Sequence, residues 1–120
     1  MKKGLFIISF FMILSLTGCE DVFNSERNPR DATVSQARGF RDGTYVRISG
    51  TIESSISREW YIFSGHTGSI SVEIENEEWA RGGINPATIV LPARFEIVGE
   101  VDREGGQQTV IDVENLRRLP

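Results

Sequence analysis

Apolar and polar residues alternate with a period of two along much of the chain after residue 44, as they do in half-buried β-strands. The alternation predicts five strands, over residues 45–52, 58–64, 69–75, 93–102 and 108–114. Their apolar positions are expected to face one core: Val46, Ile48, Ile52, Tyr61, Phe63, Ile70, Val72, Ile74, Phe95, Ile97, Ile111 and Val113. Gly50 also falls on the inward face, where a missing side chain allows the sharp bend of a small barrel. A break in the alternation at Val98 and Gly99 predicts a β-bulge.

Two short helices are predicted beside these strands. Thr33 and Gln36 have the spacing of a capping box, so a helix is expected to begin there and to end near Gly39. Asn76 is expected to be the N-cap of a second helix, which carries Trp79.

Residues 84–92 contain a short apolar run between two prolines, and we expect them to cover one end of a barrel rather than to pair as a strand. Five strands with a helix between the third and the fourth have the order of the OB fold. The prediction is therefore an all-β domain over residues 33–120. It is a small five-stranded OB-fold barrel with a short N-terminal helix and a short helix between strands three and four.

The first 18 residues have the pattern of a cleaved signal peptide. Lys2 and Lys3 precede an apolar run over residues 5–14, which is shorter than the roughly 20 residues that a membrane-spanning helix needs. The segment Leu16-Thr17-Gly18-Cys19 then resembles the bacterial lipobox. That resemblance implies cleavage before Cys19, a diacylglycerol on its sulfur and a further acyl chain, such as palmitate, on the new amino terminus. An ordinary secretory signal with an unmodified Cys19 is the alternative.

A lipidated Cys19 predicts a location in the cell envelope, with the protein anchored to a bacterial membrane and facing the periplasm. Two or three acyl chains make such attachment stable, whereas a single chain gives only marginal binding. The residue after the cysteine is Glu20, which leaves the choice between inner and outer membrane open. Residues 19–32 are polar, lack an apolar period and are expected to form a tether between lipid and barrel.

Charge and composition narrow the range of functions. The chain has 13 basic and 17 acidic side chains, and loss of Lys2 and Lys3 with the signal peptide changes the net charge from −4 to −6. A negative domain is a poor partner for phosphates, so we expect no nucleic-acid binding. Cys19 is the only cysteine, which excludes an internal disulfide.

Candidate catalytic chemistry is sparse. The one histidine, His66, lies in a glycine-flanked turn, and a lone histidine supplies neither a catalytic pair nor a zinc site. We therefore expect neither an enzyme nor a bound metal or other cofactor. Carboxylates do gather near the end of the third strand and on the fifth: Glu73, Glu75, Glu77, Glu78, Asp112 and Glu114. They are suited to attract cations such as polyamines, basic peptides or Ca²⁺, but a solvated polar face is the interpretation that we favour.

Exposed aromatic and basic side chains on the first two strands suggest a ligand surface. Tyr45, Arg47, Arg58 and Trp60 are its predicted residues, and a small molecule, a cation or a glycan is the predicted ligand. Trp60 and Tyr61 are neighbours in a strand, so one points inward and one outward, and Tyr61 is the predicted core residue.

The globular part resembles the bacterial OB-fold (BOF) family of small exported proteins. The resemblance lies in VSQA at 34–37, DGTYV at 42–46, the strand containing Gly50, YIF at 61–63, TGSISVEI at 67–74, Trp79, FEIVGEVD at 95–102, IDV at 111–113 and LRRL at 116–119. It implies a non-enzymatic binding role in stress tolerance and offers no catalytic residues. The lipobox and a long segment 84–92 depart from the family pattern. The alternative function is an adaptor that docks onto another envelope protein.

Overall fold

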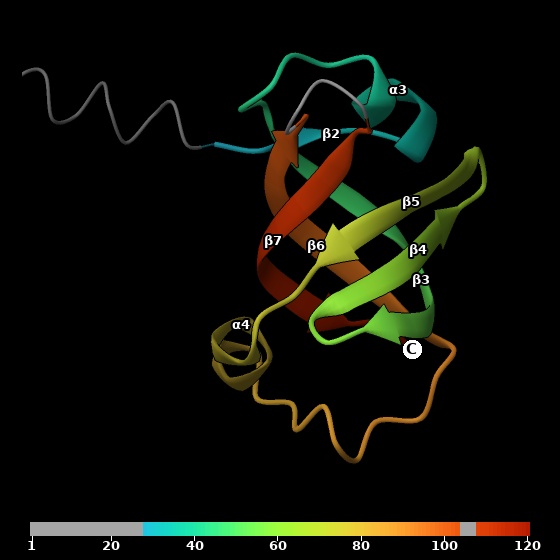
Figure 1. Cartoon of the computed structure of the whole chain (residues 1–120), viewed down its shortest axis with the longest axis vertical. Helices are drawn as coiled ribbons and strands as arrows, with labels where there is room; N and C mark the ends of the chain where they lie inside the picture. Colours follow the sequence, from blue (N-terminus) through green and yellow to red (C-terminus); the bar gives the residue numbers. More distant parts are fainter. Residues whose placement is uncertain (1–27, 104–107) are drawn as a thin grey trace, which may run out of the picture.

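One long strand, β3, closes the sheet on itself. The computed structural model describes residues 28–103 and 108–120, so the predicted signal peptide, Cys19 and residues 19–27 of the tether lie outside the described residues. The elements are β2 (Arg30–Asp31), α3 (Val34–Arg38), β3 (Tyr45–Ser57), β4 (Trp60–Gly65), β5 (Gly68–Glu73), α4 (Asn76–Arg81), β6 (Ala93–Asp102) and β7 (Val110–Arg118) (Figure 1). No helix in this part of the chain is long and apolar enough to cross a bilayer.

The strands pair in the order β2-β3-β4-β5-β7-β6, and an additional pairing of β3 with β6 completes the ring. β3 pairs with β6 over residues 45–52 and with β4 over residues 51–57. β5 and β7 are parallel, whereas the other pairs within the ring are antiparallel. With α4 between β5 and β6, this is the predicted OB order, and the fold class is confirmed.

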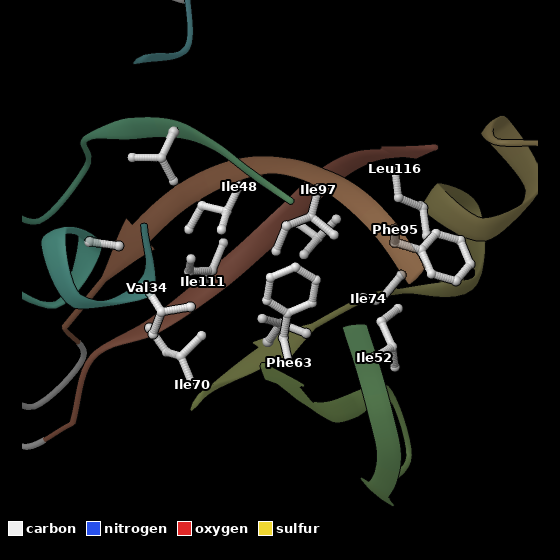
Figure 2. Close-up of a cluster of buried hydrophobic side chains, with 14 of the residues drawn as sticks. Val34, Ile48, Ile52, Phe63, Ile70, Ile74, Phe95, Ile97, Ile111 and Leu116 are labelled. Atoms are coloured by element: carbon white, nitrogen blue, oxygen red, sulfur yellow. The ribbon is translucent and has the colours of Figure 1, made fainter. Parts of the chain in front are cut away.

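The core follows the predicted inward face of each strand. Figure 2 shows side chains from α3 and from the barrel strands converging in the interior. Every predicted core residue is buried except Tyr61, which is half-buried and packs against the core. Trp79 of α4 is only 1% exposed and contacts the rings of Tyr61 and Phe95 edge-on, at centroid distances of 5.6 and 5.7 Å. These aromatic contacts tie α4 to the barrel.

Glycine is required at two places where strands approach closely. A Cβ on Gly50 would clash with the carbonyl oxygen of Ser64 and lie 2.9 Å from carbons of the Phe63 ring. A Cβ on Gly99 would clash with the backbone of β7, and the β6–β7 register shifts between Val98 and Gly99. The predicted bulge is confirmed, and the close approach of β4 explains why position 50 is a glycine.

The first helix begins as predicted, and the second does not. Thr33 Oγ1 accepts the N–H of Gln36 at 3.1 Å, and the N–H of Thr33 donates to Gln36 Oε1 at 2.9 Å, which forms the capping box. The prediction of Asn76 as an N-cap is wrong, because Asn76 is already helical and Glu75 is the N-cap. Glu75 makes no side-chain cap bond. Its carbonyl instead accepts the first helical N–H groups, from Glu78 and Trp79.

Several strand ends also differ from the prediction. β3 continues to Ser57 instead of ending at residue 52, and β7 continues to Arg118 instead of ending at residue 114. Arg58 and Glu59 form a turn before β4, so Arg58 is not a strand residue. The additional part of β3 is rich in serine and does not alternate, and its pairing with β4 is what makes it a strand.

Residues 30 and 31 correct the predicted tether. They form β2, which pairs in parallel with β3 through Arg30 and Val46 and through Asp31 and Arg47. The N–H of Ala32 also donates to the carbonyl of Arg47 at 3.0 Å. A strand of two residues is too short to produce an alternation, so sequence analysis could not distinguish it from the tether.

The segment over residues 84–92 forms no strand, as predicted. Its side chains Ile84, Ile89 and Leu91 are half-buried against the core, and the segment runs across the end of the barrel beside α4 (Figure 1). Val90 points outward and is 77% exposed.

Candidate functional site

The four predicted ligand residues do not form one site. Tyr45 and Arg47 lie at the first end of β3, whereas Trp60 pairs with Ser57 at its last end and Arg58 lies in the adjoining turn. A strand rises about 3.3 Å per residue, so the two halves are separated by most of the length of the barrel. Any ligand site therefore includes one half or the other.

The orientation of the two neighbouring aromatic residues is settled. Tyr61 packs inward against Trp79, as predicted. Trp60 points outward, is half-buried and lies opposite Glu73 of β5.

A groove of about 620 Å³ runs along the outer side of β3. It lies beside the part of β3 between Arg47, where pairing with β2 ends, and Thr51, where pairing with β4 begins. Over this stretch β3 is paired only with β6, and Val34 and Gly65 line the other side of the groove. Its polar side chains include Arg47, Ser49, Thr51, Glu53, Ser64, His66, Arg94 and Glu96.

Most charges in the groove are paired at its rim. Arg47 Nη1 lies 2.7 Å from Asp31 Oδ1, and Arg117 Nη2 lies 3.2 Å from Glu96 Oε1. Arg94 donates to the carbonyl of Pro120 at 3.2 Å. Glu53 has no salt-bridge partner among residues 28–103 and 108–120. The groove thus presents hydroxyl groups between charges of both signs, an arrangement that suits a polar ligand with many hydrogen-bonding groups.

A second feature is an acidic surface near α4. Carboxylate oxygens of Glu59, Glu73 and Glu75 lie within 4.8 Å of one another, and those of Glu75, Glu77 and Glu78 do the same. Loss of hydration, followed by repulsion from Glu78 and then from other nearby carboxylates, raises the pKa of Glu75.

The acidic surface continues across the barrel because register places carboxylates side by side. Asp112 of β7 lies opposite Glu73 of β5 and opposite Glu100 of β6. Partial burial, then repulsion from Glu114 and further carboxylates, raises the pKa of Asp112. The sequence pattern predicts the carboxylates near the end of the third strand and on the fifth, but not Glu59 and Glu100, whose proximity to them depends on strand register.

His66 is exposed in the β4–β5 turn, at the edge of the groove. Thr67, beside it, accepts the N–H of Ser35 at 3.0 Å and so joins the turn to α3.

Comparison with known proteins identifies the family. Residues 16–118 match the family model described as Bacterial OB fold (BOF) protein. The chain belongs to the BOF family. Protein YgiW of Escherichia coli (strain K12) is a BOF relative that is 34% identical over 87 residues, 72% of this chain and 62% of YgiW. The family resemblance stated from the sequence is thereby confirmed.

Two further comparisons support the assignment to the BOF family. The calcium-regulated OB-fold protein CarO of Pseudomonas aeruginosa is 38% identical over 76 residues, 63% of this chain and 61% of CarO. A solved structure of ygiW from E. coli has a TM-score of 0.64 at 33% identity and covers 75% of this chain and 90% of the solved chain. The match thus spans about three-fifths of the length of the two named relatives, YgiW and CarO.

Proposed function

We propose that this BOF protein is a lipid-anchored binding module of the cell envelope that holds a polar ligand in the groove along β3. It performs no catalysis. The role in stress tolerance that the family resemblance implies is part of the proposal.

The observation that carries the binding part is the groove itself. Its volume of about 620 Å³ lies in the range of small-molecule sites. It also brings Arg47 of the predicted surface together with Arg94 and a row of hydroxyl groups. Charges of both signs line it, which favours a ligand with hydroxyl or amide groups, such as a short glycan, over a strongly charged one.

The support for the anchor is the lipobox-like segment Leu16-Thr17-Gly18-Cys19. Mass spectrometry of the protein from native membranes tests it directly. The expected result is an acylated amino-terminal Cys19, and Cys19→Ser is expected to leave the protein unacylated and absent from the membrane fraction.

Thermal unfolding of the full-length protein in detergent tests the groove. The probes are a panel of oligosaccharides and peptidoglycan fragments, with Ca²⁺ and spermidine for the acidic surface. A ligand at 100 times its Kd should add about 2.7 kcal/mol of stability and raise the Tm accordingly.

Two variants locate the binding site. Ser49→Phe places a bulky ring in the groove from an exposed position, whereas Ser54→Phe makes the same change further along β3, outside the groove. The proposal expects the Tm shift to disappear in Ser49→Phe and to persist in Ser54→Phe. A shift that persists in both variants would place the ligand elsewhere.

An adaptor that docks onto another envelope protein is the second candidate. It is favoured by Ile56 and Val90, which are 53% and 77% exposed at the end of the barrel away from α3. Crosslinking and pull-down from solubilised membranes would distinguish it. The adaptor hypothesis predicts that a stoichiometric partner is captured and that the double variant Ile56→Ser with Val90→Ser no longer captures it. The groove proposal predicts no such partner.

A further inference from the structure

The point at which the tether joins the barrel is fixed by β2. Asp31 forms an ion pair with Arg47 at 2.7 Å, and Arg30 stacks over the Phe40 ring at 4.7 Å from its centroid. The chain therefore enters the domain at the end where α3 lies, away from α4 (Figure 1).

Three exposed arginines gather at that same end: Arg30, Arg38 and Arg41. None of them forms a salt bridge with a residue in the described part of the chain. A fourth guanidinium, that of Arg103, donates to the carbonyls of Arg38 and Phe40 and adds its charge beneath them. Carboxylates lie at this end as well: Asp31 pairs with Arg47, Asp42 accepts the N–H of Arg103, and Asp102 ends β6.

The opposite end is richer in carboxylates. Glu59 lies in the β3–β4 turn, and Glu75, Glu77 and Glu78 lie at the start of α4. Arginines occur at both ends, since Arg58 and Arg118 lie at the far one, but the carboxylates crowded at α4 and the β3–β4 turn give the far end the larger share of negative charge.

We propose that the α3 end rests on the anionic headgroups of the membrane that holds Cys19, with α4 directed away from that membrane. This inference rests on the lipid anchor of the proposed function. Eight residues lie between Cys19 and Asn28, so the nine Cα–Cα steps between them span at most about 32 Å and the arginines stay close to the bilayer. A short tether gives a high local concentration, and each arginine near an anionic surface raises binding roughly five-fold.

Fluorescence quenching in vesicles tests this orientation. The full-length lipidated protein is reconstituted into vesicles with 30% phosphatidylglycerol in phosphatidylcholine, or into pure phosphatidylcholine, each with a spin-labelled headgroup lipid. Acylation blocks the Cys19 thiol, so one introduced cysteine carries the fluorophore. Ser35→Cys reports on the α3 end and Thr88→Cys reports on the α4 end, because both side chains are exposed.

The expected result is at least three-fold stronger quenching at position 35 than at position 88 in the anionic vesicles. This preference should shrink in neutral vesicles and at 0.5 M salt, which screens surface charge. The double variant Arg38→Glu with Arg41→Glu should abolish it. The control variant Arg58→Glu with Arg118→Glu makes the same change in net charge at exposed positions of the other end and should leave the preference intact.

Equal quenching at the two positions, or a preference that is the same in neutral vesicles, overturns the inference. Thermal unfolding checks that each variant remains folded. Co-sedimentation with the vesicles reports separately on the anchor, so a wild-type protein that fails to sediment contradicts the lipid anchor and not the orientation alone.

Discussion

Asp112 of β7 lies opposite Glu100 of β6, with Glu73 opposite it on the other side. Three neighbouring strands therefore present carboxylates in one row, and like charges placed directly opposite in a sheet are destabilising. The acidic surface costs the fold stability at neutral pH.

The pH dependence of stability should reveal that cost. Partial burial and then the neighbouring carboxylates, Glu114 first, raise the pKa of Asp112 above its ordinary value of 3.8. The folded state then holds the proton more tightly than the unfolded state, so stability falls as the pH rises from about 3.8 through the raised pKa. Asp112→Asn should be more stable than the wild type at pH 7 and lose that advantage below about pH 4. Tm values measured from pH 3.5 to 8 check this, and Glu53→Gln, at an exposed carboxylate outside the row, should change little.

Trp79 should be the most sensitive core position. It is 1% exposed and contacts two other rings, and large-to-small replacement of a buried aromatic costs about 3–5 kcal/mol. Trp79→Ala is therefore expected to remove a large part of the stability of a domain this size, as measured by urea unfolding. Trp60→Ala, at a half-buried outward position, should cost clearly less. Equal losses would contradict the assigned packing.

Gly50 should not tolerate a side chain. A Cβ there would meet the Ser64 carbonyl and the Phe63 ring, so Gly50→Ala is expected to destabilise the domain by about 1–3 kcal/mol, the range for overpacking. A Cβ added at Gly39 would lie 3.7 Å from the Gln36 carbonyl oxygen, an ordinary van der Waals contact, and the backbone there is not left-handed. Gly39→Ala should therefore lie within about 0.5 kcal/mol of the wild type.

The ion pair of β2 should contribute little to global stability. Its side chains are 39% and 82% exposed, and exposed pairs contribute about 0.2–1 kcal/mol. Asp31→Ala is thus expected to lower the free energy of unfolding by less than about 1 kcal/mol. Hydrogen exchange at the N–H of Ala32, which bonds to Arg47, should nevertheless become faster, because β2 separates from β3 more often. Unchanged exchange would mean that the pair does not hold β2.

The fold could be predicted from the sequence because the alternation of apolar and polar residues marks the strands and the turn residues mark where they end. Gly50, the Val98–Gly99 bulge and the Thr33 capping box each have a local physical cause that the residues themselves display. The prediction of Asn76 as the N-cap was wrong because the start of α4 depends on where the chain leaves β5. That position is set by tertiary structure, not by the local sequence.

The site was less accessible to sequence analysis. Alternation gives the face on which Tyr45, Arg47 and Trp60 lie but not their position along the barrel. The length of β3 separates them, and its last part, around Ser55, does not alternate. The proximity of Glu59 to Glu73 likewise depends on register and on a turn in which Glu59 adopts a φ of 69°.

The ring closed by β3 and β6 has a consequence for how copies of the domain meet at high concentration. Unpaired strand edges invite neighbouring copies to pair with them and aggregate. At the open end of the described sheet, the edge strand β2 is only two residues long, directly follows Pro29 and consists of an arginine and an aspartate. Copies of the domain that meet at high concentration therefore find little backbone at this edge with which to pair.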